Sequence, residues 1–181
     1  MMNLQRAFTF LELMITLALI SIITALSMPL LRHFGEYDRA MSLQWRMLRM
    51  IQLARNEARI RGVSVVICHH RSSICPDGNM YRVAAYANEQ SNPTILAMVQ
   101  IREYQGALHW RLFPKYRNDF LFYPTGVMQS DNGTLWFCST SHIAPVWAIV
   151  INKAGRARAI SPDENDKIYG SDGKPLRCDE T

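Results

Sequence analysis

The chain has 181 residues, 49% of them hydrophobic and 19% charged, which excludes a disordered or collagen-like protein. Beyond an apolar N-terminal segment, this length leaves room for one globular core of roughly 120 residues. The net charge of +5 is concentrated in residues 32–61, where seven Arg stand against three acids, so the basic excess directly follows the apolar segment.

Residues 8–31 are the first predicted element, an apolar run whose only charged residue is Glu12. As a helix, this run is long enough to cross a hydrocarbon core of about 30 Å. A secretory signal would be shorter and would end at a small-residue cleavage site, and no such site follows Leu31. We therefore expect the segment to be retained as a membrane anchor. A carboxylate inside it costs roughly 2.5–3.5 kcal/mol at the bilayer centre, which makes Glu12 a candidate functional residue.

Cleavage just before Phe8 would place a new α-amine four residues from the Glu12 carboxylate. Residues 7–12, Ala-Phe-Thr-Phe-Leu-Glu, follow a short leader containing Arg6 and resemble the processing site of type IV prepilins and type II secretion pseudopilins. The resemblance implies that a prepilin peptidase cuts between Ala7 and Phe8 and methylates Phe8, and that Glu12 guides filament assembly. Ala7 replaces the family's usual Gly, and we expect slower or equal cleavage. The alternative is a plain single-pass anchor in which Glu12 has no role.

Residues 32–61 continue the helix, because apolar side chains recur at helical spacing and Gly62 follows as a stop signal. The apolar stripe consists of Leu43, Met47, Met50, Ile51, Ala54 and Ala58. Arg46, Arg49, Arg55 and Arg59 lie off the stripe. These Arg side chains fit a solvated or lipid-headgroup face, or alternatively a contribution to nucleic-acid binding. Within the helix, Pro29 predicts a kink or local melting near Ala25.

Residues 62–181 contain short runs rich in Val, Ile and aromatic residues, which predict strands. The predicted strands are 63–69, 80–87, 95–101, 107–112, 120–123, 135–138, 146–151 and 156–160. Turns are predicted at Asp77-Gly78, Asn92-Pro93, Asp131-Asn132-Gly133 and Ala154-Gly155. One long helix followed only by strands predicts an α+β fold with antiparallel sheets packed against that helix.

Four cysteines lie beyond the apolar segment, which suggests two disulfides in an oxidising compartment. Three pairings exist for Cys68, Cys75, Cys138 and Cys178. A bridge between Cys68 and Cys75 would close a short loop and leave Cys138 and Cys178 as the second pair. The neighbouring His69 and His70 match no common zinc spacing, so we expect a disulfide with exposed histidines and no metal. No cofactor motif or catalytic motif occurs, and we expect no enzymatic activity.

Four segments of the domain resemble the FimT/GspH-type minor pseudopilins. They are Ala-Arg-Asn-Glu-Ala at 54–58, Phe-Tyr-Pro-Thr-Gly at 122–126, Leu-Trp-Phe-Cys at 135–138 and Gly-Arg-Ala-Arg at 155–158. The resemblance implies a pilin-like fold with a leader at 1–7, a transmembrane half-helix at 8–31, an amphipathic half-helix at 32–61 and a periplasmic β-rich domain at 62–181. It also implies a single-pass protein of the bacterial inner membrane, which can also occur in the extracellular pilus, with other pilins or pseudopilins as partners.

The predicted hairpin around Gly155 is the candidate binding site. Strand alternation places Arg156 and Arg158 on one face with Lys153 at the turn, and guanidinium groups so spaced suit neighbouring phosphates. Such contacts bind double-stranded DNA without sequence preference. In the family, a Gly-Arg-x-Arg motif at this place is associated with DNA capture in natural transformation. The alternatives are a structural hairpin with solubilising Arg side chains, as in a GspH-like subunit of a type II secretion system without DNA binding, or a pilus-tip initiator.

Overall fold

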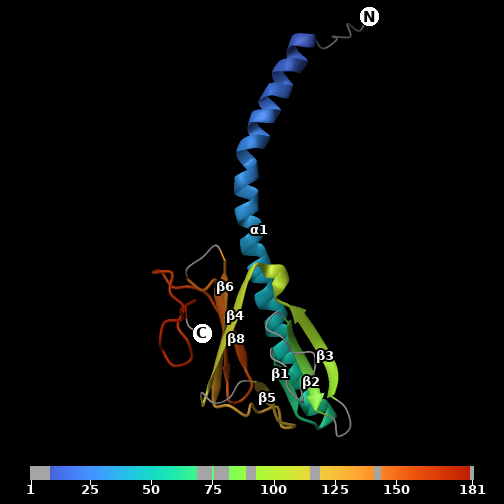
Figure 1. Cartoon of the computed structure of the whole chain (residues 1–181), viewed down its shortest axis with the longest axis vertical. Coiled ribbons are helices and arrows are strands. Elements are labelled where there is room, and N and C mark those ends of the chain that lie inside the picture. Colours follow the sequence, from blue (N-terminus) through green and yellow to red (C-terminus); the bar gives the residue numbers. More distant parts are fainter. Residues whose placement is uncertain are drawn as a thin grey trace, which may run out of the picture. The chain divides into compact units, whose positions relative to one another are not determined.

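The computed structural model describes residues 9–68, 75, 82–88, 93–114, 119–140 and 144–179 (Figure 1). The side chains of residues 28–34, 82 and 88 are outside this description. The chain forms two compact units, residues 1–38 and residues 39–181. The predicted processing residues Ala7 and Phe8, and the histidines His69 and His70, lie outside the described residues.

Residues 10–38 of the first unit belong to α1, which runs from Phe10 to Arg61. Thr9 caps the helix, because its hydroxyl oxygen accepts a hydrogen bond from the Glu12 backbone N–H at 3.3 Å. The stretch Phe10–Ser27 is long and apolar enough to cross a membrane, by length and composition. The helix is continuous through Pro29, so local melting near Ala25, one form of the predicted disturbance, does not occur.

Hydroxyl groups in this apolar stretch bond to the backbone of their own helix. Thr16 and Ser21 donate to the carbonyls of Leu13 and Ala18, and Thr24 and Ser27 bond in the same way to carbonyls three or four residues earlier. Because lipid offers no hydrogen-bond partners, such internal bonds make these polar residues compatible with a hydrocarbon environment.

The second unit contains the rest of α1, and the apolar stripe predicted for it is confirmed as buried. Leu43, Met47, Ala54 and Ala58 are completely buried, and Met50 and Ile51 nearly so. The helix ends at Arg61, and Gly62 follows with a φ of 66°, the left-handed conformation typical of a helix C-terminus. The predicted end of the helix is therefore confirmed.

All eight predicted strands occur in the described part of the domain, in two antiparallel sheets. The first sheet has the order β3-β2-β1-β5, with β1 at Val65–Cys68, β2 at Arg82–Asn88, β3 at Pro93–Gln100 and β5 at Phe120–Phe122. The second has the order β4-β6-β7-β8, with β4 at Gly106–Phe113, β6 at Asn132–Ser139, β7 at Trp147–Asn152 and β8 at Ala157–Ile160. A 3₁₀-helix, η1 at Arg102–Tyr104, links them.

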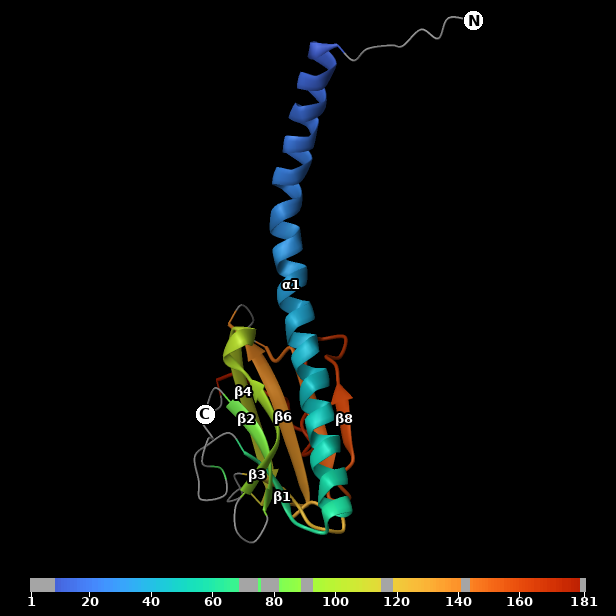
Figure 2. The ribbon, with the colours of Figure 1, turned by 90° about the vertical axis from the view of Figure 1, so that its right-hand side faces the viewer.

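The core joins the second half of α1 to both sheets (Figure 2). Met47 and Ile51 of α1 belong to one buried cluster with Ile67 of the first sheet and Phe137 and Ile149 of the second. The inner strands β1, β2, β6 and β7 are buried on both sides, because two smaller buried clusters cover the faces turned away from this core. This arrangement confirms the predicted α+β fold.

One predicted turn is wrong, because Asn132 and Gly133 lie inside β6 rather than in a loop. Gly133 pairs with Leu112 of β4. A β-carbon at Gly133 would lie 2.5 Å from the Phe120 ring and 2.8 Å from the Leu112 side chain. Glycine is therefore present to make room for an aromatic ring, and its occurrence after Asp-Asn does not mark a turn.

The disulfides join Cys68 to Cys75 and Cys138 to Cys178. This is the pairing that the short Cys68–Cys75 spacing suggests. The second bond connects β6 to the C-terminal segment, which is also held by a hydrogen bond from Trp136 Nε1 to the Arg177 carbonyl at 3.0 Å. The segment thereby covers the outer side of the second sheet, where Ile168 and Leu176 pack with Trp136.

Candidate nucleic-acid interface

The turn between β7 and β8 is closed by three hydrogen bonds around Asn152. Gly155 N–H donates to the Asn152 carbonyl at 2.8 Å, and Asn152 N–H donates to the Arg156 carbonyl at 3.1 Å. The Asn152 side-chain oxygen accepts from Arg156 N–H at 3.0 Å. Gly155 has a φ of 71°, which a residue with a side chain adopts only at a cost. The position of Arg156 at the start of β8 is thus set by backbone geometry.

This turn is packed against α1 through a second glycine, Gly126. A β-carbon at Gly155 would lie 2.6 Å from the Gly126 carbonyl oxygen and 3.0 Å from Arg55 Cδ. Gly126 also has a positive φ, 77°, and a β-carbon there would lie 2.6 Å from Arg59 Cδ. Arg55 Nε donates to the Gly126 carbonyl at 3.2 Å. Two glycines therefore allow the turn and the loop after β5 to approach the arginine stems of the helix.

Lys153, predicted as a DNA contact, is bound to an acid. Its ammonium group lies 2.7 Å from Asp131 Oδ1, and the two side chains are 66% and 50% exposed. The hydrogen bond to Asp131 and the charge of its carboxylate raise the pKa of Lys153 above its ordinary value. Lys153 is therefore charged at neutral pH, and its charge is locally compensated.

Arg156 and Arg158 are exposed, and no carboxylate of the described residues forms an ion pair with either. Arg158 pairs with Val150 in the β7–β8 ladder, and Ala157, between the two arginines, packs on the core. Alternation about Ala157 places the two guanidinium groups on the side of the strand away from the core. Their charges are available to an anionic partner.

A groove of about 420 Å³ lies between this turn and α1. Its lining consists of Gln52, Arg55 and Asn56 from the helix and Gly155, Arg156 and Ala157 from the turn and β8. Among these lining residues there is no acid. The helix thus adds a cation and two amides to the basic turn.

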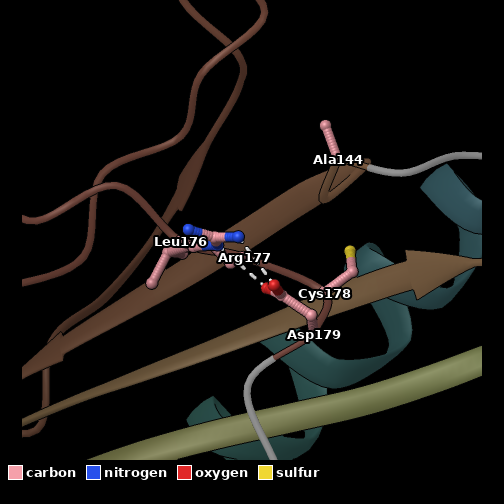
Figure 3. Close-up of a pocket in the computed structure, with 5 residues that line it drawn as sticks. All are labelled: Ala144, Leu176, Arg177, Cys178 and Asp179. Atoms are coloured by element: carbon pink, nitrogen blue, oxygen red, sulfur yellow. Dashed lines mark hydrogen bonds and ion pairs between the residues drawn. The ribbon is translucent and has the colours of Figure 1, made fainter.

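A second cavity, of about 490 Å³, lies beside the Cys138–Cys178 disulfide (Figure 3). It is lined by Ala144, Leu176, Arg177, Cys178 and Asp179. Figure 3 shows Arg177 and Asp179 facing each other across two contacts, of 2.9 and 2.7 Å, and this pairing lowers the pKa of Asp179. The Arg177 guanidinium is already bound to a carboxylate. This cavity is therefore a weaker candidate for an anionic ligand than the groove.

The structure brings Lys153, Gly155, Arg156 and Arg158 together at one turn. Glu12 lies in the other unit, and the four cysteines form the two disulfides. Sequence reasoning did not assign Asn152, Gly126 or Asp131 to the site. Gly126 ends the Phe-Tyr-Pro-Thr-Gly segment, and a glycine after Pro-Thr is a signal of an unusual backbone conformation. Nothing local indicated that Asn152 or Asp131 would join the turn.

A model of the family described as type II transport protein GspH matches residues 46–155, and the prokaryotic N-terminal methylation motif matches residues 2–28. The minor pilin FimU of the Pseudomonas aeruginosa type IV system is a structural neighbour, with a TM-score of 0.51 at 15% identity, covering 70% of this chain and 92% of FimU. The minor pseudopilin EpsH of the Vibrio cholerae type II secretion system has a TM-score of 0.53 at 12% identity, covering 70% of this chain and 99% of EpsH. Comparison of the sequence with curated proteins gave no match.

Proposed function

The chain belongs to the GspH family, a family of minor pilins and pseudopilins, and from this premise we propose that it is a filament subunit that binds double-stranded DNA through its β7–β8 turn. The filament is of the type IV pilus kind, and the binding serves DNA uptake in natural transformation. The contacts come from Arg156 and Arg158, with Gly155 shaping the turn and Lys153 beside it.

The N-terminus directs the subunit to the membrane and the filament. A prepilin peptidase cuts the leader 1–7 between Ala7 and Phe8 and methylates Phe8, in keeping with the methylation motif matched over residues 2–28. Residues 8–31 then hold the protein in the inner membrane, residues 32–61 connect to the domain, and residues 62–181 lie in the periplasm. The Glu12 carboxylate pairs with an N-terminal amine, of its own or of a neighbouring subunit, because an unpaired charge in lipid is costly.

The observation that carries the DNA proposal is the pair of exposed arginines without a described acid partner, on a turn held rigidly against α1. Guanidinium groups bind phosphate oxygens through charge-assisted hydrogen bonds. A rigid turn loses little conformational freedom when it binds, so more of the contact energy appears as affinity. Contacts of this kind read no bases and give binding without sequence preference.

Replacing both arginines, Arg156→Ala with Arg158→Ala, is expected to weaken DNA binding at least about tenfold. Fluorescence anisotropy of a labelled duplex, titrated with the full chain in a neutral detergent, measures this loss. Because two phosphate contacts disappear, the dependence of log affinity on log salt concentration should become shallower by about two.

The control removes the same charge elsewhere, with Arg102→Ala and Lys167→Ala. Arg102 lies in η1, next to the Gly106–Ser139 end of the second sheet, whereas the β7–β8 turn lies at the Asn132–Asn152 end. Equal losses in the two double variants would reduce the effect to net charge and contradict the assignment of the turn.

The second candidate function is that of a structural pseudopilin of a type II secretion system with no DNA role. The description of the matching family as a type II transport protein favours it. The same anisotropy experiment separates the two candidates, because a wild-type chain that does not bind the duplex at low salt leaves only the structural role.

A further inference from the structure

The groove between α1 and the β7–β8 turn presents hydrogen-bond donors from both walls. Gln52, Arg55 and Asn56 lie at positions i, i+3 and i+4 of the helix, so they share one face. Arg156 stands on the opposite wall. Two residues with amide side chains and two arginines thus line a space of about 420 Å³, which is large enough for a phosphodiester group.

Arg55 is held in place before any ligand binds. Its Nε donates to the Gly126 carbonyl, and its Cδ lies 3.0 Å from the position that a β-carbon of Gly155 would take. The side chain is half-buried, and among the described residues the Gly126 carbonyl is its one hydrogen-bond partner. Its two terminal nitrogens therefore keep their donors for a ligand. A planar guanidinium fixed in this way matches the oxygen spacing of a phosphate and loses little entropy on binding it.

One acid of the helix and one acid bound to the turn each form an ion pair with a cation. Glu57, next to Asn56 in the helix, forms a 2.6 Å ion pair with Arg61, and Asp131 holds Lys153. Neither carboxylate is left to compensate Arg55 or Arg156. The charge of the groove is therefore positive, which favours an anionic ligand.

We propose that the sugar-phosphate backbone of one DNA strand lies in this groove, with Arg55 and Arg156 on the phosphate and Gln52 and Asn56 as neutral donors to it. This inference rests on the proposed function and extends its site from the turn onto the helix. Phosphate contacts from helix and turn together fix the direction of the strand across the domain, as backbone contacts do in other protein–DNA interfaces.

Placing a carboxylate in the groove tests the inference without removing Arg55. Gln52→Glu and Asn56→Asp change exposed side chains by one charge each and leave the Arg55 bond to Gly126 intact. Each is expected to weaken binding of the labelled duplex to the full chain by about three- to tenfold, because a like charge then faces the phosphate. The matched controls, Gln100→Glu on exposed β3 and Asn165→Asp in the C-terminal segment, should change affinity less than twofold.

Removing the Arg55 charge gives a second readout. Arg55→Gln should make the salt dependence shallower by about one, the value for one phosphate contact. Circular dichroism of the variant at the assay temperature must match that of the wild type. Asn56→Asp carries the test by itself if Arg55→Gln fails to fold.

The outcomes distinguish this inference from the function on which it rests. If the wild type binds DNA and the Arg156/Arg158 double variant does not, but the groove variants bind like their controls, the groove assignment is wrong and the turn assignment stands. If the wild type itself does not bind DNA, the groove assignment and the turn assignment are both wrong. Groove variants that bind DNA normally but lose binding to anionic phospholipid vesicles would show that the ligand of the groove is a lipid headgroup and not DNA. This result would also overturn the inference.

Discussion

At the scale of single residues, the candidate interface is shaped by which cations are paired and which are not. Lys153 and Arg156 lie within one turn, yet Lys153 is bound to Asp131 and Arg156 has no described acid partner. The Asp131 carboxylate lies before β6, far from the turn in sequence, and a motif of basic residues cannot reveal it. The three basic residues Lys153, Arg156 and Arg158 therefore overstate the free charge at the turn by one.

Releasing Lys153 should increase DNA affinity. In Asp131→Asn the lysine keeps its charge, because even without the carboxylate its pKa returns only to about 10.5, well above neutral. We expect affinity to rise about two- to fivefold and the salt dependence to steepen by about one as Lys153 takes a phosphate contact. Anisotropy titrations over a range of salt concentrations measure both.

The matched control is Asp179→Asn, which makes the same charge change and removes the carboxylate that Arg177 binds in another exposed ion pair. Its affinity should stay close to that of the wild type. A similar rise in both variants would mean that net charge alone changes the affinity. Because the Lys153–Asp131 pair is exposed, its loss should leave the thermal midpoint almost unchanged. The raised pKa of Lys153 means that the pair stabilises the fold up to about pH 10.5 and is lost as the lysine deprotonates above it.

At the level of the helix and strands, two faces of α1 contact the rest of the domain. Its apolar stripe is buried against both sheets, and the face that carries Arg55 and Arg59 receives the loop at Gly126 and the turn at Gly155. The arginine stems fill the space that the two missing β-carbons leave, so long basic side chains are also packing residues here. A change in either glycine should therefore act on stability and on the site together.

Gly155→Ala tests this close packing. The substitution imposes a side chain at a φ of 71° and places a β-carbon 2.6 Å from the Gly126 carbonyl oxygen. We expect it to lower the free energy of unfolding by about 2–4 kcal/mol, the sum of backbone strain and a forced shift of the turn. Denaturant titration of the full chain, followed by tryptophan fluorescence, measures the change.

Gly173→Ala is the matched control. Gly173 has nearly the same φ, 72°, but no atom lies within 4 Å of its added β-carbon, so the change should cost only the conformational term of about 1 kcal/mol. Equal losses at the two positions would show that Gly155 is required only for its backbone angle and that the helix does not confine the turn.

At the scale of the whole molecule, the chain combines an exposed apolar helix with a domain that has its own core. The stretch Phe10–Ser27 has no buried residues, whereas α1 beyond Arg39 is part of the domain core. A carboxylate at Glu12 within such a stretch is tolerable when a cation neutralises it. The proposed cleavage supplies that cation by creating an amine at Phe8.

Mass spectrometry of the protein from its native host should therefore find N-methylated Phe8 as the first residue. Glu12→Gln should be cleaved and methylated like the wild type but should be lost from sheared filaments, because the charge that pairs with the amine is gone. Glu36→Gln, a like change outside the apolar stretch, should leave filament incorporation intact. An uncleaved N-terminus, or a different first residue, contradicts the proposed processing.

The helix and the strands could be predicted from the sequence, because their signals are local. The apolar stripe of Leu43, Met47 and Ile51 has the period of a helix with one buried face, and Gly62 marks its end. Runs of Val, Ile and aromatic residues located each strand of the described residues to within a few positions. The even number of cysteines beyond the apolar segment indicated two disulfides, and the short Cys68–Cys75 spacing suggested which partners they join.

Which distant segments contact one another could be learned only from the folded chain. Arg55 and Gly126 are 71 positions apart, and no periodicity records that the loop after β5 touches the helix there. Gly133 lies in a strand because Phe120, from the other sheet, fills the space beside it. The strand order and the Lys153–Asp131 pair depend in the same way on contacts between elements. Such contacts are selected by the packing of the whole core, and a local pattern states only which side of each element faces that core.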